Sequence, residues 1–331
     1  MSASPLLRAG DRGDAVRDLQ QRLVTTGARI VVHGRFDAGT ERAVRTFQER
    51  RGLRVDGICG PETWGALIES GFAPGDRLLY LCQPMLRGDD VAVLQQRLNA
   101  LGFDAGREDG ILGPATEAAI GAFQRDAGLA ADRVCGPATL GALERLGSLA
   151  GGSVATVRER EALRRRRPRR LDGVRVFVAG DLGLAALTST IAGHLRRGGA
   201  LVLDTSGEDP SFVAATANRF EAEVFVALTT GAEHGARCAY FANNTFRSEG
   251  GHHLAEQLTG ALRSVLPAVD EPVGRTYRLL RETRMAAVVC ELATRGDADA
   301  MASLACQLPL LAHAIVDGVR RGIEEPVDAQ A

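Results

Sequence analysis

The chain has 331 residues, of which 45% are hydrophobic and 24% charged, and its formal net charge at pH 7 is -1. A chain of this length usually forms two or three domains, and this composition is typical of soluble globular proteins. The balanced charge argues against a general nucleic-acid binder, although all 40 basic residues are arginines, which suit bidentate contacts with carboxylates and phosphates.

No segment has the apolar length of a secretory signal at the N-terminus or of a membrane span further along the chain. The six cysteines lack any Cys-x-x-Cys spacing, which favours reduced thiols that are buried as small apolar side chains. We therefore expect a cytoplasmic protein with no transmembrane segment.

The first half of the chain contains an internal repeat. Segment 12–23 recurs as 87–98, and segment 40–67 recurs as 116–143. So many matches in register indicate a duplicated module.

Each copy of the repeat has the pattern of three helices. Apolar residues three and four positions apart predict the first helix, and a Gly-Pro step predicts the start of the third. The second helix is expected to begin near Thr40 or Thr116, each able to act as an N-cap. The sequence thus predicts two all-α three-helix modules, over residues 1–72 and 76–147.

The closing loop of each copy resembles that of the type 1 peptidoglycan-binding modules, whose pattern there is Asp-Gly-x-x-Gly-x-x-Thr. The first copy departs from the family at His33, where Asp is usual, and the second at Arg133, where Gly is usual. Modules kept only as scaffolds or as protein-docking surfaces remain an alternative. The resemblance implies a set of candidate peptidoglycan-binding residues: Asp56, Gly57, Gly60, Thr63, Asp132, Gly136 and Thr139.

An arginine-rich segment over residues 148–173 follows the modules and is interpreted as a linker. Blocks of like charge tend to extend in solvent, which favours a solvated tether. The alternative is that these arginines contact anionic lipid headgroups, nucleotide-sugar phosphates or an acidic partner.

Residues 174–324 alternate between strand-like and helical patterns, which predicts an α/β sandwich around a twisted mixed sheet, followed by a tail over 325–331. The expected strands are 174–179, 200–204, 224–228, 239–242 and 287–291, and the expected helices are 184–197, 213–220, 254–266 and 304–323.

This second half resembles the zinc-dependent N-acetylmuramoyl-L-alanine amidases. Segment 279–291, Leu-Leu-Arg-Glu-Thr-Arg-Met-Ala-Ala-Val-Val-Cys-Glu, is close to the family's Val-Leu-Arg-x-Thr-x-Met-Pro-Ala-Val-Leu-Val-Glu. Segment 212–228 also follows the family pattern that leads to its Ser-Ile-His strand. The resemblance implies the amidase fold over nearly all of this half.

The zinc ligands that this resemblance implies are missing. The family holds zinc with His, Glu and His, leaves a position for water, and uses a carboxylate as general base. Asp181 occupies the segment of the first His, Thr229 the position of the second, and no loop with a ligand Glu lies between Gly183 and Leu184. Only Glu291 aligns with the catalytic Glu, and we interpret it as vestigial.

We therefore expect no zinc cofactor and a degenerate cleft that is available to a ligand or partner, formed around Asp181, Thr229, Arg281 and Glu291. Glu291 is expected to persist as a buried strand-end carboxylate bound to backbone or to an arginine. A site rebuilt with His234 is the alternative, but zinc needs three convergent ligands, so structural or solvated histidines are favoured.

Taken together, the chain resembles the CwlM-like family of actinobacteria. That resemblance implies a cytoplasmic regulator of cell wall biogenesis that stimulates the UDP-N-acetylglucosamine enolpyruvyl transferase under the control of a Ser/Thr kinase. We interpret the chain as a pseudoenzyme that binds peptidoglycan fragments or precursors. The alternatives are an active zinc-dependent amidase in cell-wall turnover and a structural wall-binding protein.

Overall fold

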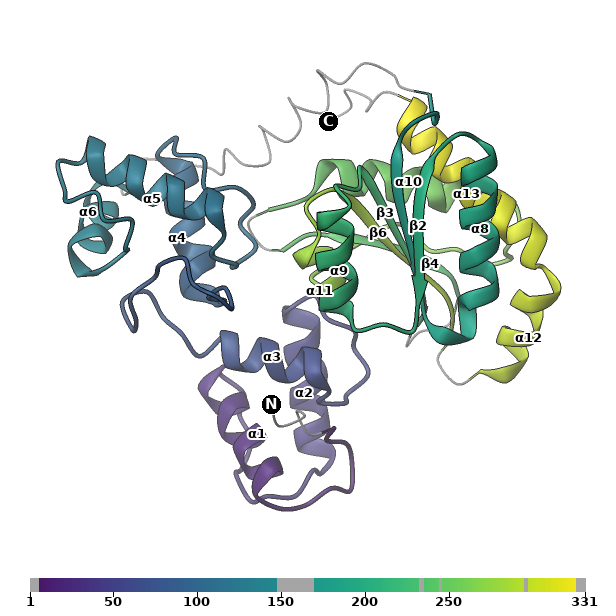
Figure 1. Ribbon diagram of the computed structural model, residues 1–331. Coiled ribbons are helices and arrows are strands. Elements are labelled where there is room, and N and C mark those ends of the chain that lie inside the picture. The colour runs from purple at the N-terminus through teal and green to yellow at the C-terminus, as the bar shows by residue number, and fades with distance from the viewer. Residues whose placement is uncertain (1–5, 148–169, 232–234, 244–245, 295–296, 326–331) are drawn as a thin grey trace. The chain divides into compact units, whose positions relative to one another are not determined.

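The computed structural model describes residues 6–147, 170–231, 235–243, 246–294 and 297–325. The chain divides into two compact units, Met1–Arg158 with Asn244–Phe246, and Glu159–Asn243 with Arg247–Ala331. The first unit contains both repeats, and the second contains the α/β domain (Figure 1). Most of the predicted linker, residues 148–169, lies outside the described residues.

The two repeats fold as three-helix modules, which confirms the all-α prediction. Each has its own core, made in the first module by residues such as Val16, Leu19, Val44 and Phe47. The helices are α1 (Asp14–Thr25), α2 (Ala38–Arg50) and α3 (Pro61–Glu69) in the first module, and α4 (Asp89–Ala100), α5 (Pro114–Asp126) and α6 (Pro137–Gly147) in the second.

The expectation that Thr40 and Thr116 cap the second helices is wrong. Asp37 is the N-cap of α2, and its carboxylate accepts hydrogen bonds from the Thr40 backbone N–H at 2.8 Å and hydroxyl at 2.9 Å. These bonds lower the pKa of Asp37 to about 2. The N-cap of α5 is Gly113, and each threonine is instead the third residue of its helix.

A buried glutamine side chain organises each loop between helices. In the first module, the Gln48 amide nitrogen donates toward Asp56 Oδ1 at 2.8 Å, the Ile58 carbonyl at 2.9 Å and Thr63 Oγ1 at 3.1 Å. Its oxygen accepts the Gly57 N–H at 2.9 Å. The loop thus folds around one amide whose donors and acceptor are satisfied, as burial requires. Gln20, Gln95 and Gln124 hold the other three loops in the same way.

The α/β domain contains a mixed sheet, as predicted, with strand order β2-β1-β3-β6-β4-β5. Strands β2, β1, β3 and β6 are parallel, β4 runs antiparallel to β6, and β5 is parallel to β4. The strands are β1 (Arg175–Gly180), β2 (Leu201–Ser206), β3 (Val224–Gly231), β4 (Arg237–Phe241), β5 (Val273–Arg275) and β6 (Ala286–Thr294).

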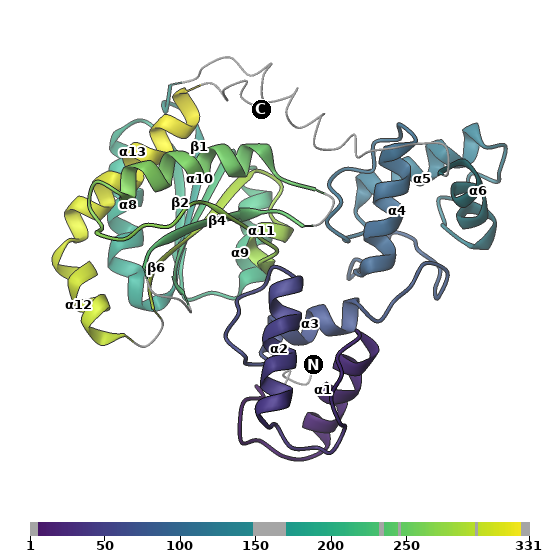
Figure 2. The ribbon, with the colours of Figure 1, turned by 180° about the vertical axis from the view of Figure 1, so that it is seen from behind.

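Helices cover both faces of this sheet, as a mostly parallel sheet requires. Helices α8, α10 and α13 lie on one face, and α9 and α11 on the other (Figures 1 and 2). On the second face the Phe177 and Phe225 rings stack with centroids 5.7 Å apart. The helical elements are η1 (Leu182–Leu184), α8 (Ala185–Arg197), α9 (Pro210–Arg219), α10 (Glu249–Leu262), α11 (Arg278–Glu282), α12 (Ala298–Cys306) and α13 (Leu308–Glu324).

Three details of the α/β domain differ from the sequence-based expectation. Strand β5 and helix α11 were not predicted, because a few residues carry too little periodicity to identify an element. The helix expected over 304–323 is two helices that separate at Gln307, since Pro309 near the start of α13 cannot continue a preceding helix. Among the described helices, none alone is long and apolar enough to cross a bilayer, and only α12 with α13, bent by 77°, meets that test as a pair.

The second module carries a local strain that the first lacks. Arg133 donates its backbone N–H to Gln124 Oε1 at 2.8 Å, as Gly57 does to Gln48, and both residues have left-handed backbone angles, with φ of 62° and 73°. A side chain is disfavoured in that conformation.

We therefore expect Arg133→Gly to raise the free energy of unfolding of the second module by about 1 kcal/mol. The lost ion pair with Glu117 is 3.6 Å long and partly exposed, so it offsets only part of this gain. Urea unfolding followed by circular dichroism measures the change. The reciprocal variant Gly57→Ala should destabilise the first module. If neither variant changes the unfolding free energy of its module relative to the unchanged protein, the strain at Arg133 is contradicted.

Candidate functional site

A row of polar side chains crosses four neighbouring strands of the α/β domain. Thr229 on β3 is the register partner of Glu291 on β6, which is in turn the partner of Arg237 on β4. Asp181 follows β1 and continues the row, because its N–H donates to the Leu228 carbonyl at 2.9 Å. The row lies toward the carboxyl ends of β1, β3 and β6, the edge where open α/β sheets usually bind ligands.

Glu291 is the buried centre of this row, with only 2% of its surface exposed. Its Oε2 accepts from Arg237 Nε at 3.1 Å, and its Oε1 accepts from the Tyr277 hydroxyl at 2.8 Å. Gly231 makes room for it, since a Cβ there would lie 3.2 Å from Glu291 Cβ. The carboxylate is therefore held at both oxygens, and its charge is compensated by a guanidinium.

Asp181 is held by the end of β3. Its Oδ2 accepts from the Thr229 hydroxyl at 2.7 Å and from the Thr230 N–H at 3.1 Å. The chain then enters η1 directly and α8 at Ala185, so the connection after β1 is short. This agrees with the absence, in the sequence, of a longer loop at this point.

Two thiols lie on the opposite side of the same strands. Cys238 and Cys290 are register partners, both fully buried, with their Sγ atoms 3.7 Å apart. The hydrogen bond with Cys238 and burial raise the pKa of Cys290 well above its usual value, so this thiol is neutral at physiological pH. The pair thus belongs to the apolar core between the sheet and its helices.

The structure brings Asp181, Thr229 and Glu291, which the sequence assigned to the cleft, close together. Asp181 contacts Thr229, and Thr229 is the register partner of Glu291. The fourth residue, Arg281, lies on α11 and is half-buried, and its backbone N–H donates to the carbonyl of Tyr277 at 2.9 Å. The expectation that an arginine binds a buried Glu291 is confirmed by Arg237.

Sequence reasoning missed Arg237 and Tyr277 as members of the site. Arg237 begins β4, two residues before the predicted strand, and no local pattern reveals that β4 pairs with β6. Tyr277 directly precedes the amidase-like segment 279–291, and that position was the one available signal.

The side-chain groups in this row that could bind a metal differ from the ligands of a catalytic zinc site. They are two carboxylates and hydroxyls, with one carboxylate already paired with a guanidinium. Three-ligand catalytic zinc sites usually contain imidazoles, as in His-Glu-His. Within the described ranges, no group of three His, Cys, Asp or Glu side chains could hold a metal ion. The alternative ligand His234 lies outside the described residues.

The candidate residues of the modules hold their own loops. Asp56 and Thr63 accept from the Gln48 amide, and Asp132 and Thr139 accept from the Gln124 amide. Gly60 and Gly136 are the N-terminal neighbours of α3 and α6, and Gly57 has the left-handed angle described above. The loop contacts thus account for the two aspartates, the two threonines and Gly57, whereas Gly60 and Gly136 have room for a side chain and no positive φ. The part of all seven residues in binding a ligand stays a prediction.

The Glu291 ion pair generates a test of stability. Arg237→Met leaves a buried carboxylate without its cation, so the α/β domain should lose about 3 kcal/mol or more of unfolding free energy. Urea unfolding measures this loss, with the transition of the α/β domain fitted separately.

The matched control is Arg263→Met, which breaks the exposed 2.6 Å ion pair with Glu271 in the same domain. An exposed pair contributes at most about 1 kcal/mol, so this variant should be nearly neutral. If the two variants lose equal amounts of unfolding free energy, the buried Glu291 pair contributes no more to stability than an exposed pair.

Known proteins resemble both the repeats and the α/β domain of this chain. The peptidoglycan binding domain family matches residues 12–67 and 87–143. The N-acetylmuramoyl-L-alanine amidase CwlM of Mycobacterium tuberculosis is 36% identical to this chain, in an alignment that covers 86% of this chain and 81% of that protein.

Solved amidases resemble the α/β half more distantly. The N-acetylmuramoyl-L-alanine amidase from Clostridium difficile has 19% identity and a TM-score of 0.39, covering 45% of this chain and 95% of its own. The enzyme from Mycobacterium smegmatis has 14% identity and a TM-score of 0.39, covering 47% and 99%. Because CwlM is 36% identical across most of both chains, this chain belongs to the CwlM family of amidase-like, peptidoglycan-related proteins.

Proposed function

We propose that this chain is a pseudo-amidase, a non-catalytic protein that binds peptidoglycan fragments or precursors and regulates precursor synthesis in the cytoplasm. The observation that carries the proposal is the state of Glu291, whose two oxygens are bound by Arg237 and Tyr277. The relative CwlM is named an amidase, so the competing function is zinc-dependent hydrolysis.

Zinc-dependent amide hydrolysis needs a carboxylate that takes a proton from metal-bound water. Glu291 is the family's candidate, but its charge is compensated by the Arg237 guanidinium at 3.1 Å. A divalent cation beside that guanidinium would be repelled by it in a buried, poorly screened environment. Asp181 and Thr229, which bond to each other, replace the imidazoles at the ends of β1 and β3. The residues present therefore do not fit a catalytic zinc, and we propose that no cofactor is bound.

The modules support the binding part of the proposal. Both copies match the peptidoglycan binding domain family, and both keep intact, glutamine-held loops. A protein with two such modules can engage a repeating polymer at two points, which raises its apparent affinity without new contacts.

The regulatory part of the proposal names a partner and a control. The sequence resemblance to the CwlM-like regulators suggests the UDP-N-acetylglucosamine enolpyruvyl transferase as the enzyme that is stimulated, and a Ser/Thr kinase as the control. Retention as a structural wall-binding protein is the further alternative, and finding the chain in the wall fraction of the native host would favour it.

The absence of hydrolysis is tested on purified full-length protein. After incubation with zinc and dialysis, elemental analysis should find far less than one zinc per chain, because the donor set does not suit the ion. Muropeptides incubated with the protein should release no stem peptide, whereas an active zinc amidase run in parallel should release it. Stoichiometric zinc together with turnover would establish the competing function.

Regulation is tested with the enolpyruvyl transferase from the same host. The rate of phosphate release should rise and then saturate as the chain is added, because a stimulating partner must bind the active state of the enzyme more tightly. The chain should be assayed before and after treatment with the host's Ser/Thr kinase. A rate unchanged under both conditions would remove the transferase from the proposal.

A further inference from the structure

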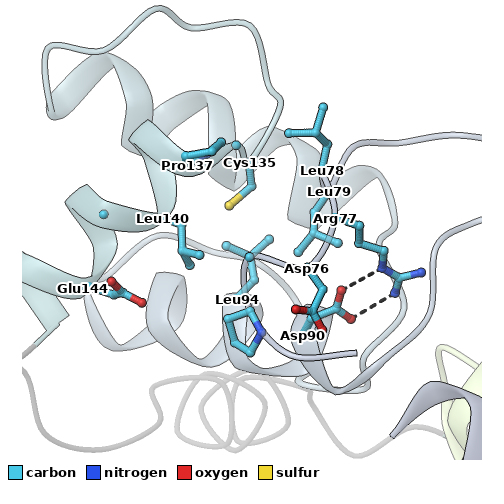
Figure 3. Close-up of a pocket in the computed structure, with 14 residues that line it drawn as sticks. Asp76, Arg77, Leu78, Leu79, Asp90, Leu94, Cys135, Pro137, Leu140 and Glu144 are labelled. Atoms are coloured by element: carbon cyan, nitrogen blue, oxygen red, sulfur yellow. Dashed lines mark hydrogen bonds and ion pairs between the residues drawn. The ribbon is translucent and has the colours of Figure 1, made fainter. Parts of the chain in front are cut away.

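The second module contains a pocket of about 400 Å³. It lies between segment 74–79, helix α4 and helix α6, and Figure 3 shows the side chains that line it. Its volume is within the usual range of small-ligand pockets, roughly 300–1,000 Å³.

The inner part of this pocket is apolar. Leu79, Leu94 and Cys135 are buried there, and Leu140 lies beside them (Figure 3). Burial is the largest cause that raises the pKa of the Cys135 thiol to about 11, so the thiol is neutral at physiological pH. An aliphatic chain is the kind of group that this surface would remove from water.

One wall is fixed by a bidentate ion pair. Arg77 Nε and Nη2 lie 2.8 Å and 3.0 Å from the two oxygens of Asp90, which is 1% exposed. The same guanidinium donates to the Arg87 carbonyl at 2.6 Å and stacks 3.7 Å from the centre of the Phe72 ring. These contacts hold the wall in place before any ligand arrives, which lowers the entropy cost of binding.

The rim carries two further carboxylates. Asp76 and Glu144 are both exposed and line the pocket. One oxygen of Asp76 accepts the Ala73 N–H at 2.7 Å, and Glu144 forms an ion pair with Arg97 at 3.3 Å. Because Asp90 is matched by Arg77 and Glu144 is partly compensated by Arg97, the remaining negative charge at the mouth comes mainly from Asp76. A cation on a flexible chain suits such a mouth.

The first module does not repeat this arrangement at the corresponding positions. The Leu7–Cys59 and Leu79–Cys135 bridges set the correspondence between the two copies. Counterparts of 73–77 fall in residues 1–5, outside the described part of the chain. Where the second module has Asp90, Leu140 and Glu144, the first has Ala15, Trp64 and Ile68 in turn, so a large indole replaces Leu140 and two acids are lost.

We propose that the pocket of the second module binds a short peptide through an alkylammonium side chain, such as the diamino acid of a peptidoglycan stem peptide. The alkyl chain packs on Leu94 and Leu140, and the ammonium lies at the rim near Asp76 and Glu144. This inference rests on the proposed function and adds which module, which surface and which part of the ligand are used.

The experiment is isothermal titration calorimetry of the full chain with the tripeptide L-Ala-γ-D-Glu-L-Lys. A second titration uses the same peptide with norleucine in place of lysine, which keeps the chain but removes the charge. We expect the lysine peptide to bind about tenfold more tightly at low salt, and the difference to shrink at 1 M salt, where charges are screened beyond about 3 Å.

Variants locate the binding surface. Leu140→Trp copies the first module and fills the pocket, so it should weaken binding at least about tenfold, while Asp76→Asn and Glu144→Gln should each weaken it about threefold. The matched control is Ile68→Gln in the first module, at the position that corresponds to Glu144, and it should leave the affinity unchanged. Circular dichroism of each variant checks that the modules remain folded.

Sedimentation of the full chain with insoluble peptidoglycan separates the two proposals. If the chain sediments with the wall material but the lysine peptide does not bind, or binds equally to Leu140→Trp, the pocket is not the site and the proposed function stands. If neither the wall material nor the peptide binds, the proposed binding function itself fails.

Discussion

A carboxylate can be buried in a protein only when its charge and its hydrogen-bonding capacity are matched. In the α/β domain this condition is met for Glu291 by Arg237 and Tyr277, and the rest of the polar row is arranged around that match. The antiparallel pairing of β4 with β6 is what places the arginine opposite the glutamate. The sheet order thus provides the compensating charge, through Arg237.

The modules solve a related problem with neutral groups. Their loops must turn sharply while leaving backbone N–H and carbonyl groups inside, and a glutamine amide from the preceding helix satisfies these groups. The motif residues Asp56 and Thr63 accept hydrogen bonds from that amide, so the motif has a structural role in forming the loop. Recognition of a ligand can then depend on surfaces where the two copies differ, because residues at those positions are not needed to hold the loop.

The sequence predicted the elements whose pattern is local and could not predict the contacts that are not. The repeat, the helix faces and the long strands follow from periodicity within a few residues. The N-cap of α2 was misplaced by one turn, because Asp37 and Thr40 are both good caps and only the helix start decides between them. The pairing of Arg237 with Glu291 links positions on two strands far apart in sequence, so it required the sheet itself.

The position of β6 in the sheet has a consequence for biosynthesis. It is the last of the described strands along the chain, yet it lies between β3 and β4 in the middle of the sheet. On the ribosome, the helical modules can fold as soon as they emerge, whereas β3 and β4 have no central neighbour until residues 286–294 leave the exit tunnel. Until then apolar strand edges stand open, so this domain, and not the modules before it, is where nascent chains would meet chaperones.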